Sequence, residues 1–190
     1  MIRILDKSIA DKIAAGEVIE RPVSIVKELV ENALDAGASS VVVEIKHGGK
    51  SYIRVTDDGC GIPADQVETA FLRHATSKIE TADDLNAIET LGFRGEALAS
   101  ICAVTRCELV TKCPEAKTGT RLVLHGGEMV AKEATGCPDG TTIRNILVQK
   151  RHDLRRALLV VAELHIGKQH IQPLRLFCQT SHLLEHPWWD

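Results

Sequence analysis

The chain has 190 residues, of which 44% are hydrophobic and only 3% aromatic, and its net charge is −3. This length fits one domain with a sizeable core, and the composition requires that core to be built from aliphatic side chains. The small negative charge excludes a general electrostatic attraction to nucleic acid, so any DNA contact needs a local basic patch.

The cysteines and the N-terminal residues indicate a reducing compartment. None of the six cysteines forms a C-x-x-C pair or another metal-type spacing, which predicts free thiols. Charged residues occur too early and too often in "MIRILDKSIADKIAAG" for the apolar core of a signal peptide. We therefore predict a cytoplasmic location and expect no membrane partner.

The first third of the chain predicts helices followed by one β-hairpin. Residues 8–19 predict a short helix with Ser8 as its N-cap. Residues 20–37 predict a longer helix, because a proline lies in the first turn and a glycine follows the last apolar residue. Residues 39–59 predict two strands around a Gly-Gly turn.

The next part of the chain mixes helical and alternating patterns. Helices are predicted at residues 63–75, 81–92 and 96–105. Strands are predicted at residues 106–113, 120–135 and 140–148. Helices and hairpins without regular βαβ alternation favour an α+β fold, a two-layer sandwich in which helices cover one face of a mixed, mostly antiparallel sheet.

The long predicted helix carries an unusual polar face. Its apolar residues gather on one side at about 100° per residue, whereas Glu28, Asn32 and Asp35 fall on the opposite side. A solvated face is the more frequent origin of such a pattern. The alternative is a functional site, because a carboxylate can orient or deprotonate water and an Asn oxygen can ligate Mg²⁺.

A strand that runs into Asp57, Gly59 and Gly61 gives a second candidate site. A carboxylate at a strand end can accept a hydrogen bond from an exocyclic amine, and glycines allow the backbone to approach a flat ligand. An ordinary Asp-Gly turn explains the same residues, so this pattern is weak when it is read alone.

Three polar segments could contact phosphate groups or a base. Residues 73–78 (RHATSK) place hydroxyls and a lysine after a helix, and residues 139–143 (DGTTI) place two hydroxyls at a strand start. Residues 90–100 set glycines before a helix, whose free N–H groups suit phosphate. The sequence has no G-x-x-x-x-G-K-[ST] loop. Read singly, these segments are explained by caps, loop glycines and solvent exposure.

Taken together, five blocks in this order resemble one family. The blocks are IAAGEVIERP (13–22), KELVENALDAGA (27–38), DDGCGI (57–62), RHATSKI (73–79) and LGFRGEALASI (91–101). They resemble the ATP-binding (GHKL, or Bergerat) fold of DNA gyrase B subunits, ninety-kilodalton heat-shock chaperones, sensor histidine kinases and MutL mismatch-repair proteins. The match is specifically to the N-terminal domain of MutL, and with G-T-T it covers about residues 1–143.

The resemblance implies a role for each matching residue. Glu28 would activate the attacking water, Asn32 would bind Mg²⁺, and Asp57 would hold the adenine amino group. Gly59 and Gly61 would make room for the base, and Thr142, with Thr141 beside it, would assist at the adenine. The residues that would close over the ribose and phosphates are Thr76, Ser77, Lys78, Gly92, Phe93, Arg94, Gly95 and Glu96.

The resemblance also implies cofactors and partners. ATP and Mg²⁺ are the expected ligands, and ATP would act as a conformational switch that pairs two N-terminal domains into a homodimer. The dimer would couple mismatch recognition by a MutS-type protein to downstream repair enzymes. DNA contacts of this chain are expected to be weak and non-specific.

Residues 144–190 do not continue the family pattern. This tail contains five of the eight histidines and ends in Trp188-Trp189-Asp190, and it lacks the loop and the second domain of family members. We interpret it as a divergent tail of a frameshifted or truncated chain. Because the second domain supplies a lysine to the phosphates in the family, nucleotide binding is expected to survive, whereas hydrolysis is expected to be weak or lost.

Three functions compete at this point. The first is a MutL-type ATPase domain, and the second is another enzyme on the same fold. The third is a catalytically impaired module that binds ATP or dimerises. The FRGEALAS block favours MutL over gyrase or a chaperone, and the intact Glu28 disfavours a dead site.

Overall fold

The computed structural model describes residues 3, 6, 13, 15, 19, 21–79, 90–92 and 94–147, and the backbone of residues 175–180. The helix predicted at 8–19, with its N-cap Ser8, lies almost entirely outside these residues. Most of the helix predicted at 81–92 also lies outside them.

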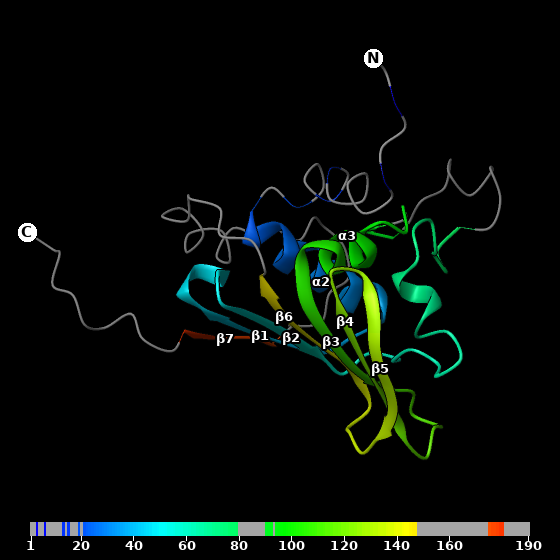
Figure 1. Cartoon of the computed structure of the whole chain (residues 1–190). Coiled ribbons are helices and arrows are strands. Elements are labelled where there is room, and N and C mark those ends of the chain that lie inside the picture. Colours follow the sequence, from blue (N-terminus) through cyan, green and yellow to red (C-terminus); the bar gives the residue numbers. More distant parts are fainter. Residues whose placement is uncertain are drawn as a thin grey trace, which may run out of the picture.

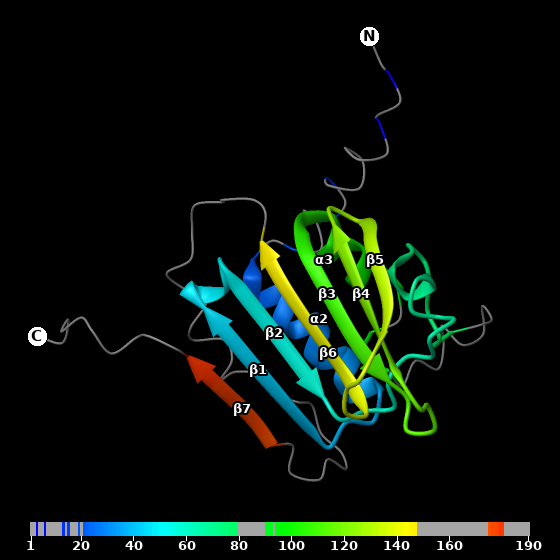
Figure 2. The same ribbon diagram turned by 60° about the horizontal axis from the view of Figure 1, so that its bottom comes forward.

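A seven-stranded sheet forms one layer of the fold, in the order β5-β4-β3-β6-β2-β1-β7 (Figure 2). The strands are β1 (Ser40–Lys46), β2 (Tyr52–Asp57), β3 (Thr105–Lys112), β4 (Gly119–His125), β5 (Glu128–Thr135), β6 (Gly140–Leu147) and β7 (Arg175–Thr180). Neighbouring strands pair antiparallel except β7, which runs parallel to β1 at the sheet edge. The predicted mixed, mostly antiparallel sheet is confirmed.

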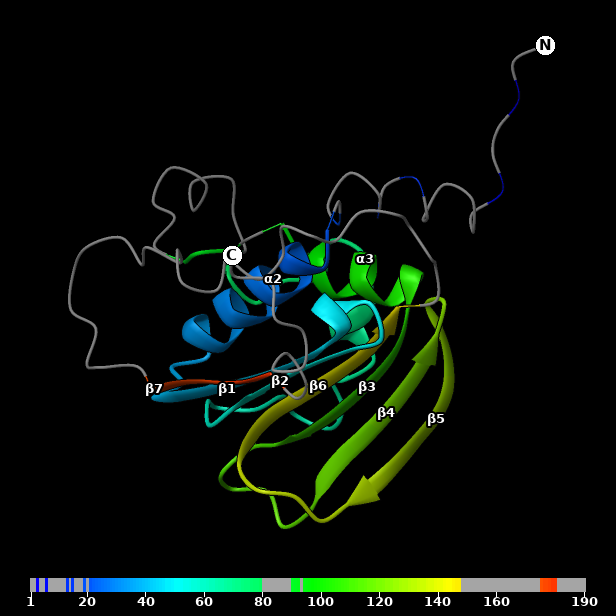
Figure 3. The ribbon, with the colours of Figure 1, turned by 90° about the vertical axis from the view of Figure 1, so that its left-hand side faces the viewer.

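In the described part of the chain, the helices α2 (Pro22–Asp35) and α3 (Ala97–Val104) cover one face of the sheet and form the second layer (Figures 1 and 3). The apolar side of α2 is buried through Ile25, Val26, Leu29, Val30 and Ala33. It packs on the inward-facing residues of the β1–β2 hairpin, Val41, Val43, Ile53 and Val55. The core is therefore aliphatic, as the composition requires, and the polar side of α2 is left for other contacts.

The opposite face of the sheet carries paired charges. Acidic and basic side chains join neighbouring strands in the ion pairs Glu44–Arg54, Arg144–Glu108, Arg121–Glu108 and Arg121–Glu133. In β1 to β4 these charged residues alternate with buried inward-facing residues, which is the pattern that predicted the strands. One face of the sheet is thus covered by helices and the other is polar.

The helix predicted at residues 63–75 is wrong. The structure has turns there and one short 3-10 segment, η2 (Thr69–Phe71). The apolar spacing buries only two side chains. Beyond them, the His74 N–H donates to the Gly95 carbonyl at 3.0 Å, so pairing with another loop replaces further helical hydrogen bonds.

The remaining predicted elements are present with shifted ends. The hairpin turn is a 3-10 segment, η1 (His47–Gly49), and α3 and β3 to β6 occupy the predicted positions. β7 was not predicted, because residues 175–180 show no clear apolar period. β6 also runs to Leu147, four residues past the predicted end of the domain.

Candidate functional site

The polar side of α2, the end of β2 and two loops enclose a cleft of about 1190 Å³. The loops comprise residues 73–78 and 90–96. The predicted site residues that line the cleft are Glu28, Asn32, Asp57, Gly61, Thr76, Ser77, Lys78, Gly92, Arg94, Gly95 and Glu96. Gly59 and Thr142 are not among its lining residues, and Phe93 lies outside the described residues. Segments far apart in the sequence therefore meet at one place.

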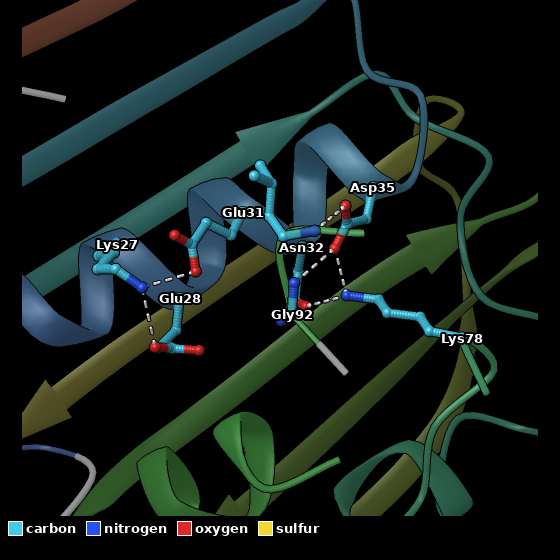
Figure 4. Close-up of polar contacts among 8 residues, drawn as sticks. Lys27, Glu28, Glu31, Asn32, Asp35, Lys78 and Gly92 are labelled. Atoms are coloured by element: carbon cyan, nitrogen blue, oxygen red, sulfur yellow. Dashed lines mark hydrogen bonds and ion pairs between the residues drawn. The ribbon is translucent and has the colours of Figure 1, made fainter. Parts of the chain in front are cut away.

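The helical period brings Glu28 and Asn32 to the cleft from successive turns of α2 (Figure 4). The Glu28 side chain is 26% exposed, and the Lys27 ammonium lies 3.5 Å from one of its carboxylate oxygens. The same ammonium lies 2.8 Å from Glu31, one turn further along the helix. Glu28 is thus held at the cleft surface, where its carboxylate can reach water.

Asp57 ends β2 on the helix-covered side of the sheet. Its Oδ1 accepts a hydrogen bond from the Gly59 N–H at 2.9 Å, and the adjacent backbone N–H of Thr141 also donates to it. Burial raises the pKa of Asp57 above its ordinary value; these two hydrogen bonds oppose the shift, and the charge of Asp58 adds to it. A half-buried carboxylate therefore faces the cleft as a hydrogen-bond acceptor.

This raised pKa predicts a pH dependence of stability. At pH values below the ordinary Asp pKa the carboxyl is protonated in both the folded and the unfolded chain, so its burial costs nothing. As pH rises through the raised pKa, the folded chain holds a disfavoured charge, and the free energy of unfolding decreases. In urea unfolding across this window, the free energy of unfolding of the wild type minus that of Asp57→Asn should decrease as pH rises. Parallel curves for the two proteins would contradict it.

The two threonines of G-T-T point to opposite faces of β6. Thr141 pairs in register with Asp57 and lines the cleft, and its hydroxyl lies 3.0 Å from that of Thr111. Thr142 donates to the Thr56 hydroxyl at 3.1 Å on the other side of the sheet. Because successive strand residues alternate between faces, Thr141 is the threonine positioned to contact a ligand here.

The two glycines after Asp57 do different things. Gly59 supplies the N–H that orients the Asp57 carboxylate. Gly61 has a φ of +69°, and a Cβ atom at this position would lie 2.3 Å from the Lys112 carbonyl oxygen. Only glycine fits such a position without displacing backbone. Gly61 therefore lets the loop after β2 pass close to the end of β3 at Lys112.

The two loops that border the cleft are joined to each other. One Glu96 carboxylate oxygen lies 2.8 Å from His74 Nδ1, and the other lies 3.7 Å from the Arg73 guanidinium. Together with the His74 to Gly95 backbone hydrogen bond, these contacts make residues 73–78 and 90–96 one unit. Within the first loop, the Lys78 N–H donates to the Thr76 hydroxyl at 3.1 Å.

Asp35 is the residue that sequence reasoning left without a role. Its side chain is only 9% exposed, and its Oδ2 lies 2.5 Å from the Lys78 ammonium. The same carboxylate accepts hydrogen bonds from the backbone of Leu91 and Gly92 (Figure 4). The signal in the sequence was its place one turn after Asn32, on the side of α2 that faces the cleft.

The oxygen atoms of the side chains at the cleft are suitable ligands for an Mg²⁺ ion that also binds oxygen atoms of a ligand. Among the described residues, no group of three or more His, Cys, Asp or Glu side chains could hold a metal alone. The cleft instead offers the Asn32 amide oxygen near carboxylates, which are the hard ligands that Mg²⁺ uses beside water and phosphate. The Lys78 ammonium lies 3.1 Å from this Asn32 oxygen, so the position accepts a cation.

No helix in the described part of the chain is long and apolar enough to cross a membrane.

The chain is similar to proteins of one known family. Residues 17–151 match the family model described as histidine kinase-, DNA gyrase B-, and HSP90-like ATPase. A DNA mismatch repair protein MutL from Agathobacter rectalis is 60% identical over 141 residues, which are 74% of this chain and 22% of that protein. One from Acidobacterium capsulatum is 45% identical over 188 residues, which are 98% of this chain and 27% of that protein. The chain thus spans about a quarter of these relatives.

A solved structure shows the same fold. The Aquifex aeolicus MutL ATPase domain complexed with ADP is similar with a TM-score of 0.58 and 32% identity, covering 77% of this chain and 55% of that chain. The family model covers most of the sheet and both helices. The chain therefore belongs to the histidine kinase-, DNA gyrase B-, and HSP90-like ATPase family and, within it, to the MutL group.

Proposed function

We propose that the cleft binds ATP together with Mg²⁺ and that Glu28 activates water for hydrolysis. The observation that carries the proposal is that Asp57 and Glu28 line one cleft, although they come from a strand end and a helix. Asp57 would accept the adenine amino group, with the Thr141 hydroxyl beside it. The related Aquifex domain was solved with ADP, which supports a nucleotide as the ligand.

The phosphates would lie between α2 and the two loops. Asn32 would hold Mg²⁺, which neutralises phosphate charge when bound. Thr76, Ser77, Lys78, Gly92 and residues 94–96 line the cleft, and their side chains and backbone N–H groups would bind phosphate oxygens. Glu28 would orient or deprotonate the attacking water.

In the whole protein this site would act as a switch. Bound nucleotide would hold the two loops closed and favour the pairing of two N-terminal domains. The protein would act in the cytoplasm. It would couple mismatch recognition by a MutS-type protein to downstream repair enzymes. Residues 1–143 would form the ATPase unit. The contribution of residues 144–190 to it would include the edge strand β7, which pairs with β1.

Two measurements on the 190-residue chain test the proposal. Isothermal titration with a non-hydrolysable ATP analogue and Mg²⁺ should show one site per chain. A phosphate-release assay should show slow turnover, and Glu28→Gln should reduce it by about a hundredfold or more while leaving analogue binding within about threefold. The matched control is Glu133→Gln, on the polar face of the sheet, which should change neither quantity.

Either of two results would overturn the proposal. Absence of analogue binding at millimolar concentration would reject the nucleotide site. Unchanged phosphate release in Glu28→Gln would show that another group activates the water.

A further inference from the structure

The Asp35 carboxylate uses both of its oxygens to hold the loops that border the cleft. Oδ1 accepts from the Leu91 N–H at 3.0 Å. Oδ2 accepts from the Gly92 N–H at 3.3 Å and from the Lys78 ammonium at 2.5 Å. One nearly buried side chain thus connects the end of α2 to residues that follow it by 43 to 57 positions.

The Lys78 ammonium is shared between two partners on α2. It donates to Asp35 and also to Asn32 Oδ1 at 3.1 Å. This oxygen is the proposed Mg²⁺ ligand. A positive ammonium and a divalent cation cannot both lie against one oxygen without strong repulsion, so binding of the cation requires Lys78 to leave Asn32.

We propose that Asp35 is a positioning residue that fastens both loops to α2, and that Lys78 occupies the Asn32 oxygen until Mg²⁺ and nucleotide displace it. The fastening by Asp35 exists in the free chain and does not depend on any ligand. The exchange at Asn32 rests on the proposed ATP function. When Lys78 leaves Asn32, Asp35 can still hold its ammonium, and the loops stay attached while the oxygen becomes available.

Amide hydrogen exchange of the free chain tests the role of Asp35. The side-chain amide of Asp35→Asn has only one acceptor oxygen. Its NH₂ group would face the Lys78 ammonium and the Gly92 N–H, which donate to Oδ2 in the wild type. We expect the amides of Leu91 and Gly92 to exchange about tenfold faster. Unchanged exchange of both amides would overturn the proposal.

Asp58→Asn is the matched control for this measurement. Asp58 also accepts from two backbone N–H groups, those of Ser39 and Ser40, each at 2.8 Å, but it does not line the cleft. Both N–H groups donate to the same oxygen, Oδ1, which an asparagine keeps, so Asp58→Asn should leave exchange at Ser40, Leu91 and Gly92 unchanged. If Asp35→Asn fails to fold, the more conservative Asp35→Glu provides the same comparison: its displaced carboxylate should also accelerate exchange at Leu91 and Gly92, and wild-type rates would overturn the proposal.

The exchange at Asn32 is tested by the Mg²⁺ dependence of nucleotide binding in Lys78→Met. The quantity measured is the ratio of the analogue Kd without Mg²⁺ to that with Mg²⁺, in which a general loss of phosphate affinity cancels. Removal of the competing ammonium should raise this ratio about fivefold over the wild type. An equal or lower ratio would reject the exchange. If the wild type binds no analogue at all, the proposed function fails, whereas the hydrogen-exchange result still decides the role of Asp35.

Discussion

Asp57→Asn is expected to weaken binding of the ATP analogue by about a hundredfold, because it places a donor where the site needs an acceptor. The wild-type carboxylate is oriented by two backbone N–H groups, those of Gly59 and Thr141. An Asn side chain can keep one of these hydrogen bonds, but its NH₂ group would then meet the adenine amine. Isothermal titration of the variant with the analogue and Mg²⁺ measures the loss.

Base selectivity gives a second measure of the same residue. Guanine carries a carbonyl where adenine carries its amino group, so the Asn variant should lose much of the preference for ATP over GTP analogues. Asp58→Asn serves as the neighbouring control and should keep both affinity and preference. Wild-type affinity in Asp57→Asn, measured on a folded protein, would remove Asp57 from the site.

Gly140→Ala is expected to lower the free energy of unfolding by about 3 to 5 kcal/mol, because the position combines backbone strain with a clash. Gly140 has a φ of +103°, and an added Cβ would lie 2.1 Å from the Asp57 carbonyl oxygen and 2.9 Å from the Asp58 Cα. The methyl group would push β6 away from the end of β2. Urea denaturation measures the destabilisation.

Gly126→Ala separates the two causes. Gly126 also has a positive φ, +59°, but an added Cβ there meets no atom within 4 Å. Strain alone should cost about 1 kcal/mol at this position. Equal losses for the two variants would show that the contact with Asp57 is unimportant. The Gly140 variant should also lose analogue affinity where it still folds, since the clash displaces Asp57.

The sequence predicted an element correctly where its residues follow one clear hydrophobic pattern along the whole element. The strands β1, β3 and β4 alternate buried inward residues with more exposed outward ones, and this alternation follows directly from burial of one face of the sheet. The segment at 63–75 failed because its apolar spacing extends over little more than one turn, and a hydrogen bond from His74 to another loop then decides its shape. The β7 sequence carries no such alternation, and its parallel pairing with β1 could not be read from it.

The sequence predicted many of the residues that line the cleft but not the contacts between them. Glu28 and Asn32 follow from helical spacing, because residues four apart share a face. The family pattern selected Thr142, whereas the alternation of β6 brings Thr141 to the cleft. Asp35 could not be assigned because its partners, Lys78 and the backbone of residues 91 and 92, are set by how the loops fold back on α2.

The place of β6 in the sheet has a consequence for the order in which this chain folds. β6 lies between β3 and β2, so within the sheet the early hairpin β1–β2 and the later strands β3 to β5 are joined through a strand that follows both in the chain. Thr56 and Thr142, which meet across this join, are 86 residues apart in the chain. Closing so long a loop is slow compared with forming either hairpin. The floor of the cleft, where Asp57 meets Thr141, is therefore completed only when the two halves of the sheet become one.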